Sequence, residues 1–423
     1  MTTPQSVLAA FAIILIDLFA RAGLDKVLAL VGGPETIALW AQLQSVVELV
    51  SGVTIVGVLT GLTVMTAQLH EPSDEPILLR HALKLAFITA LSVALFVAFS
   101  SPFLSAWLTQ GKVSATLFLL AALIGCIAIL PASLNAYWLG KHQQQRMLRL
   151  ALLTSVALLM VASAAWLKFP IGELLLVQCV VLTVIGSVCW LYLRKLLRAN
   201  LAQKNSLDYR DKLMKFVPVG LAIGIMSPVS MLLIRGILAQ TLSWDEAGIM
   251  QALWRSTEWI TASAAGVLSL IFLPRFSNAY GSSRFKSELS RAGVMVLIPT
   301  AFLLAIIYLN QHAILTTLYD SRFAVSDATA AWFMLGCWIR IASWVFLFGL
   351  FAAHRTKLII VGELLSLPLY ALLLWQFSDG MSLERSAVLC CVSYLVYLVF
   401  NVAALMNSTS KRLPNVASSS TYP

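Results

Sequence analysis

A succession of long apolar runs limits the folds open to this chain more than any other feature of its sequence. The runs are continuous and about 20 residues long, which is the length an α-helix needs to cross a bilayer and about twice that of a barrel strand. A mean hydropathy of +0.87 with 11% charged residues also excludes a soluble domain, whose surface must present polar groups to water. We therefore predict an all-α polytopic membrane protein with about 12 transmembrane helices. The expected spans lie near residues 6–31, 37–68, 82–108, 114–139, 148–167, 171–193, 214–239, 247–274, 290–309, 327–353, 358–377 and 386–407.

The distribution of Lys and Arg between alternate loops predicts how the chain is oriented. Counting the loops together with the span ends that border them, 20 of these residues fall in one set of loops and four in the other. Cytoplasmic loops carry the basic excess, so both termini are expected in the cytoplasm. The net charge of +10 has the same origin and does not indicate nucleic-acid binding. No Lys or Arg precedes the first run, which contains Asp17 and Arg21, so it is expected to be a span and not a cleaved signal peptide.

The longest basic connection, residues 194–215, lies in the middle of the chain and separates six expected spans from six others. This arrangement predicts two six-helix halves, as in transporters built from parallel repeats. The predicted parts are an N-terminal lobe over 1–195, a cytoplasmic linker over 196–212, a C-terminal lobe over 213–407 and a disordered tail over 408–423.

Five cations fall inside expected spans, more than two residues from either end: Arg21, Lys26, Arg235, Arg255 and Arg340. A charge at the bilayer centre costs roughly 3 kcal/mol, so such residues normally face a protein interior or a water-filled path. Arginine suits phosphate because its planar guanidinium stays charged and binds two oxygens at once. We therefore predict that these five residues form a cationic cavity for an anionic substrate. Arg340, which has no carboxylate within reach in its own span, is the leading candidate for contact with the anion.

Five acidic residues in the spans are predicted to act in gating or ion coupling: Asp17, Asp25, Glu48, Glu258 and Glu363. Asp17, Arg21 and Asp25 share one helix face, so Arg21 can pair with either aspartate, and the same spacing also fits a purely structural ion pair. Arg255 and Glu258 can pair at i, i+3. Glu48 has no partner in its own helix, so it is either protonated or paired with a cation from another span, such as Arg21.

For two of these charged residues, a purely structural role is an alternative to a functional one. Arg235 is near the external end of its span and could reach the interface, while Glu363 could reach the opposite interface. Five tryptophans in spans eight and ten could stack on sugar rings, although Trp is also common at membrane interfaces. They are Trp254, Trp259, Trp332, Trp338 and Trp344.

Glycines and cysteines inside the spans are interpreted as packing residues. The pairs Gly57/Gly61 and Gly220/Gly224 have the spacing that lets helices approach closely. The six cysteines lie in apolar runs without a C-x-x-C motif, and no histidines stand at metal-ligand spacing, so no metal or cofactor is predicted. The sequence also lacks nucleotide-binding, serine-hydrolase and zinc-protease motifs, so we do not expect an enzyme.

Several segments together resemble the Wzx-type flippases, a polysaccharide-transporter branch of the MOP exporter superfamily, and most closely those for the enterobacterial common antigen lipid. The residues that carry the resemblance are Ser243-Trp-Asp-Glu-Ala-Gly-Ile-Met-Gln251, Arg235 to Gln240, Leu273 to Ser277, Gly33-Pro34 with Gln42, and Phe323, Trp332, Gly336, Arg340 and Glu363. Lys26, Arg235 and Arg340 also stand where relatives have basic residues. The chain departs from the pattern at Cys337, where the family has Asp, and at Asp17, where it has a cation, which puts a shared ion-coupling scheme in doubt.

The resemblance implies a MATE-like fold of two lobes around a cationic cavity with alternating access. It implies transport of an undecaprenyl-pyrophosphate-linked oligosaccharide, an O-antigen or common-antigen repeat unit, across the bacterial inner membrane toward the periplasm. Membrane lipids, a glycan polymerase and a chain-length regulator are the implied partners, with no nucleic acid.

Three alternatives remain at this stage. A MATE-like exporter of small cations would need a cavity dominated by carboxylates, and a glycan polymerase or ligase would need a large periplasmic loop rich in Arg and His. The third is an assembly scaffold that does not transport.

Overall fold

The computed structural model describes residues 4–69, 74–197 and 206–410, and within these ranges all regular structure is helical. Among the described residues, eleven helices are long and apolar enough to cross a membrane. The first of these stretches covers 54 residues, about 80 Å at 1.5 Å per residue, which is far more than one span needs. It breaks at Gly33, whose φ of 72° favours glycine, and Pro34 follows directly. It therefore accounts for two predicted spans, and the prediction of an all-α polytopic fold is confirmed.

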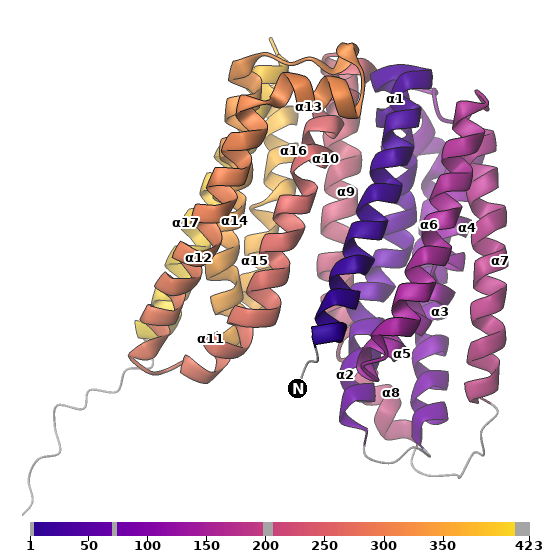
Figure 1. The fold of residues 1–423 in the computed structure, drawn as a ribbon, viewed down its shortest axis with the longest axis vertical. Coiled ribbons are helices and arrows are strands. Elements are labelled where there is room, and N and C mark those ends of the chain that lie inside the picture. The colour runs from indigo at the N-terminus through magenta and orange to yellow at the C-terminus, as the bar shows by residue number, and fades with distance from the viewer. Residues whose placement is uncertain (1–3, 70–73, 198–205, 411–423) are drawn as a thin grey trace, which may run out of the picture. The chain divides into compact units, whose positions relative to one another are not determined.

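The chain divides into two compact units, and the first consists of residues 1–248 with 318–322. In Figure 1 its helices run side by side, with α1 packed against α6, α9 and α4. The first unit contains α1 (Pro4–Thr54), the π-helical turn η1 (Ile55–Leu59), α2 (Thr60–Gln68), α3 (Glu75–Phe103), η3 (Leu104–Leu108), α4 (Ala115–Ile127), α5 (Ile129–Gly140), α6 (Gln144–Trp166), α7 (Ile171–Leu197), α8 (Ser206–Met214), α9 (Val217–Thr241) and the start of α10 (Trp244–Val267).

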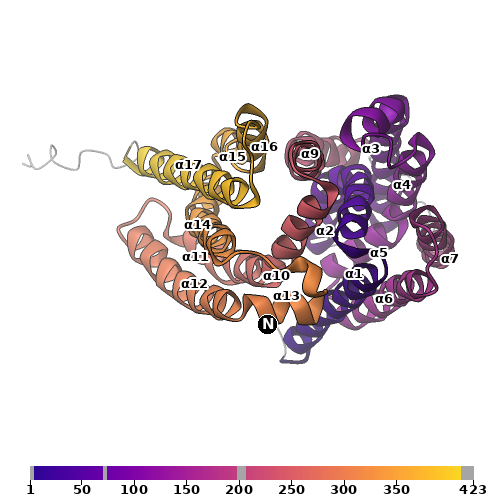
Figure 2. The ribbon, with the colours of Figure 1, turned by 90° about the horizontal axis from the view of Figure 1, so that it is seen from above.

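The second unit consists of residues 249–317 and 323–423. Its centre is α14, which Figure 2 shows between α12 and α17 and which packs against both. Ser326 begins α14 by accepting a hydrogen bond from the backbone N–H of Thr329 at 3.2 Å. The unit contains the rest of α10, η4 (Leu268–Phe272), α11 (Leu273–Ala279), α12 (Arg284–Leu309), α13 (Gln311–Leu318) up to Thr317, the 3₁₀ turn η5 (Ser321–Phe323) from Phe323, α14 (Asp327–Ala352), α15 (Thr356–Leu364), α16 (Leu367–Gln376) and α17 (Leu383–Ser410).

The glycine pairs identified in the sequence bring two helices of the first unit into close contact. A Cβ on Gly57 would lie 3.1 Å from the Cα of Gly220, and one on Gly224 would lie 2.7 Å from the Cα of Val53. A side chain at either position would crowd the backbone that faces it. The predicted close approach of the two helices is therefore confirmed.

This packing places α9 in the first unit, although the predicted lobe boundary assigns it to the second lobe. The division into two lobes of six spans each stays a prediction. Residues 198–205 of the predicted linker and 411–423 of the predicted tail lie outside the described residues, and α17 extends through Ser410.

Candidate functional site

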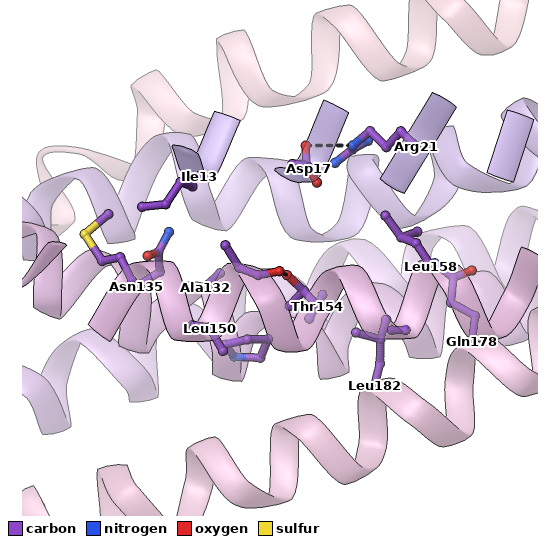
Figure 3. A pocket seen from close by; sticks show the side chains of 15 residues that line it. Ile13, Asp17, Arg21, Ala132, Asn135, Leu150, Thr154, Leu158, Gln178 and Leu182 are labelled. Atoms are coloured by element: carbon purple, nitrogen blue, oxygen red, sulfur yellow. Dashed lines mark hydrogen bonds and ion pairs between the residues drawn. The ribbon is translucent and has the colours of Figure 1, made fainter. Parts of the chain in front are cut away.

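The first unit contains a pocket of about 470 Å³ between α1, α5, α6 and α7. Asp17 and Arg21 from α1 lie on one side, and Thr154 and Gln178 from α6 and α7 lie on the other (Figure 3). Its walls are otherwise largely apolar, with residues such as Pro131 and Leu158. A concave, mostly apolar pocket with a few convergent polar groups is the usual form of a small-ligand site.

Asp17 and Arg21 form an ion pair inside this pocket. Arg21 Nε donates to Asp17 Oδ2 at 2.8 Å, and the two side chains are 45% and 49% exposed, respectively. The pairing predicted from their spacing is confirmed for Asp17, whereas Asp25 is buried and does not line the pocket. Glu48 is exposed and forms no ion pair with a described residue, so Arg21 is not its partner in this structure.

The pocket also contains polar residues that the sequence analysis did not select. Gln178 is buried and exchanges two hydrogen bonds with Gln44, at 2.9 and 3.2 Å. Asn135 lines the pocket and makes no hydrogen bond with any described residue. Amide side chains inside apolar runs are a signal that could have found both, since polar residues at membrane depth normally have a role.

Lys26 contacts a segment that lies almost 300 residues away in the sequence but belongs to the same unit. Its Nζ donates to the carbonyl oxygen of Tyr319 at 2.7 Å. Nearby, Arg322 donates to the carbonyl oxygen of Ala29 at 2.9 Å and to the Asp320 carboxylate at 2.8 Å. Hydrogen bonds from Arg322 lower the pKa of the Asp320 carboxyl. Lys26 therefore helps hold this loop on α1.

Arg235 is buried and forms hydrogen bonds within the first unit. Its side chain is only 3% exposed, and its guanidinium donates to Gln42 Oε1 at 2.9 Å and to the hydroxyl of Ser45. Gln42 in turn donates to the carbonyl oxygen of Leu232 at 3.0 Å. The alternative of reaching the membrane interface is therefore wrong, and Arg235 joins α9 to α1.

In the second unit, three aromatic rings surround Arg340. Its guanidinium carbon lies 4.8 Å from the ring centre of Trp344, 5.6 Å from Tyr394 and 5.9 Å from Trp254. It makes no ion pair or hydrogen bond with a described residue. Rings attract a cation without neutralising it, so the N–H donors of Arg340 remain available to an anion.

Two polar side chains further along α17 bind residues of other helices. Tyr397 donates to Glu363 Oε1 at 2.7 Å, and Asn401 donates to the Ser343 hydroxyl at 2.8 Å. The Tyr394 hydroxyl and Asn401 Oδ1 are buried and make no hydrogen bond with a described residue. Glu363 is therefore held by Tyr397, and the alternative of reaching the interface is not observed.

Arg255 and Glu258 form the predicted i, i+3 ion pair on α10, with 2.6 Å between Arg255 Nη1 and Glu258 Oε2. The six cysteines are unpaired. Within the described ranges, no three His, Cys, Asp or Glu side chains are grouped to hold a metal ion.

The overall fold is that of the MATE transporters. An inward-facing MATE transporter of the MOP superfamily matches with a TM-score of 0.65 and 10% identity, over 95% of this chain and 94% of that one. An outward-facing MATE transporter matches with a TM-score of 0.61 and 11% identity, over 95% of both chains. A MOP-superfamily transporter from Pyrococcus furiosus matches with a TM-score of 0.59 and 12% identity, over 96% of this chain and 92% of that one. The binding pocket of that transporter is described as having reverse polarity.

In sequence, the chain is 23% identical over 152 residues to the Lipid III flippases of Escherichia coli K12 and Shigella flexneri. The match spans 36% of each of these curated relatives, which is about a third of their length. No protein-family model matches the chain.

Proposed function

We propose that this chain is a transporter that moves a pyrophosphate-linked lipid oligosaccharide from the cytoplasmic to the periplasmic leaflet. The observation that carries the proposal is Arg340, a guanidinium in a membrane-spanning helix that faces three aromatic rings and no paired carboxylate. Its fork can bind two phosphate oxygens, and rings beside it can pack on sugar faces. The partial match to Lipid III flippases and the MATE-like fold support the same function.

Transport would require two states with different contacts to the substrate. In the structure Glu258 pairs with Arg255. On loading, the pyrophosphate would bind Arg340 and draw Arg255 away from Glu258, so that the loaded state has contacts the empty one lacks. Arg235 and Lys26 would stabilise the first unit rather than contact the substrate, because each already donates to groups of the protein. Glu48, Asp25 and Glu363 remain candidates for ion coupling.

The same proposal places the chain in the bacterial inner membrane with both termini in the cytoplasm, because of the distribution of basic loops. A polymerase and a chain-length regulator acting on the exported glycan would be its partners. A MATE-like exporter of small cations is the second candidate, favoured by the fold likeness. Arg340 disfavours it, since its positive charge would repel cationic cargo.

The test is complementation of a strain that lacks the chain. The wild type should prevent accumulation of lipid-linked glycan on the cytoplasmic leaflet, and Arg340→Ala should not, although it is folded and inserted. Arg149→Ala, at an exposed arginine of α6, is the matched control. Normal glycan export by Arg340→Ala would refute the role of Arg340, and no accumulation in the deletion strain would refute the flippase function.

A further inference from the structure

The pocket of the first unit has a balanced charge. Asp17 and Arg21 are the charged residues among its described lining, and they neutralise one another at 2.8 Å. A pyrophosphate that approached Arg21 would also meet the negative charge of Asp17. The pocket therefore suits a polar, uncharged group better than an anion.

Its polar groups offer both donors and acceptors. Asp17 accepts, Arg21 donates, and Asn135 and Gln178 can each do both. Thr154 donates its O–H to the carbonyl oxygen of Ala151, so its hydroxyl oxygen is left to accept. A sugar hydroxyl also donates one hydrogen bond and accepts up to two, so a mixed set of this kind matches a row of hydroxyls.

Gln178 is held in one orientation by its partner. The reciprocal bonds with Gln44 use one N–H and one acceptor site of each amide, which fixes the Gln178 amide and leaves its second N–H available. Asn135 has its complete amide available, since it has no partner among the described residues. The fixed amide of Gln178 and the available amide of Asn135 lie on neighbouring helices. Together they can hydrogen-bond hydroxyl groups at two positions of a sugar ring.

The apolar wall fits the rest of such a ligand. Pro131, Leu158 and Leu182 line the pocket around the polar groups, and its volume of about 470 Å³ is within the range of small-ligand sites. Sugars have C–H faces between their hydroxyls, and these faces can pack on aliphatic side chains.

We infer that this pocket is a saccharide subsite, in which Asn135, Thr154, Gln178 and the Asp17–Arg21 pair hydrogen-bond the hydroxyls of one sugar of the substrate. The inference rests on the proposed function and concerns only the glycan part of the substrate.

The test compares two probes on purified full-length protein in a detergent without a sugar headgroup. The probes are undecaprenyl pyrophosphate and the same lipid carrying N-acetylglucosamine. The wild type should bind the sugar-bearing lipid more tightly. Asn135→Ala and Thr154→Val should each lower this preference about three- to tenfold, the value of one hydrogen bond, while affinity for the sugar-free lipid stays unchanged.

Thr183→Val is the matched control, because Thr183 is on α7 and exposed outside the pocket, and like Thr154 it bonds a carbonyl of its own helix. Thermal unfolding checks that all variants are folded. Failure of the wild type to bind either lipid would contradict the proposed function. Binding of both lipids with no sugar preference, with a preference unchanged in the variants, or with a parallel loss for both lipids would overturn the subsite and leave the flippase proposal standing.

Discussion

Arg21 and Arg340 are both arginines in membrane-spanning helices, but their neighbours differ. Arg21, in the first unit, is 45% exposed and forms an ion pair with Asp17 at 2.8 Å. Arg340, in the second unit, is partly buried and has three aromatic rings within 5.9 Å. A carboxylate neutralises a guanidinium, whereas a ring stabilises the positive charge without neutralising it.

The difference shows that a cation at membrane depth does not by itself identify an anion site. The partners decide its role, and the described residues include three types: an arginine paired with an acid, Arg235 with hydrogen bonds to Gln42 and Ser45, and one held by rings. Replacing the arginine is therefore expected to have a different effect on binding or stability for each type.

The largest expected effect is on binding of lipid pyrophosphate by Arg340→Gln. Loss of two charge-assisted hydrogen bonds should cost about 3 kcal/mol, or on the order of a hundredfold in affinity for undecaprenyl pyrophosphate. Arg21→Gln should change the same affinity by less than about threefold, because its charge is already balanced. The measurement is equilibrium binding of the sugar-free lipid. Equal losses in the two variants would remove the distinction between the units.

Arg235→Met should affect stability rather than binding. The replacement leaves Gln42 Oε1, in a side chain with 0% exposure, without its donor, which should cost about 1–3 kcal/mol of unfolding free energy. The midpoint of thermal unfolding reports the loss. The double variant Arg235→Met, Gln42→Leu should recover part of it, because both polar partners are then removed; a further drop would show that Arg235 has another role.

The fold could be predicted largely from the sequence, because crossing a bilayer imposes both a length and a composition. The predicted span at 171–193 corresponds to α7 over Ile171–Leu197, and the one at 327–353 to α14 over Asp327–Ala352. The position of α9 could not be predicted in this way. It depends on a match between the surfaces of Gly57 and Gly220, which are 163 positions apart, and hydropathy does not report such pairing.

The candidate site was predictable only for local pairs. Asp17–Arg21 and Arg255–Glu258 follow from helical spacing, and both are observed. The rings around Arg340 come from α10, α14 and α17, so only Trp344, at i+4, was within reach of a local argument. The partner of an isolated charge is set by tertiary packing, which a single sequence does not reveal.

Trp344→Leu tests whether the rings hold Arg340. Trp344 is the nearest ring, and its cation–π contact should contribute about 0.5–2 kcal/mol, which would appear as a lower midpoint of thermal unfolding. Trp254→Leu should cost less, because its ring centre is 5.9 Å away. The decisive measurement is a double-mutant cycle with Arg340→Met. A coupling energy near zero would mean that the rings only fill space.

The smallest expected effect comes from Asp17→Asn, which would make Arg21 resemble Arg340 by removing its neutralising partner. The change keeps the shape of the side chain, and because the pair is about half exposed it should contribute only about 0.2–1 kcal/mol. Affinity for undecaprenyl pyrophosphate should therefore rise by no more than about fivefold, because the released guanidinium becomes a second, weaker site for the anion. The gain should shrink as salt is added, since exposed charges are screened beyond about 8 Å at physiological ionic strength. A fall in affinity would mean that Asp17 positions Arg21 for the anion, and the two arginines would then share one task instead of dividing two.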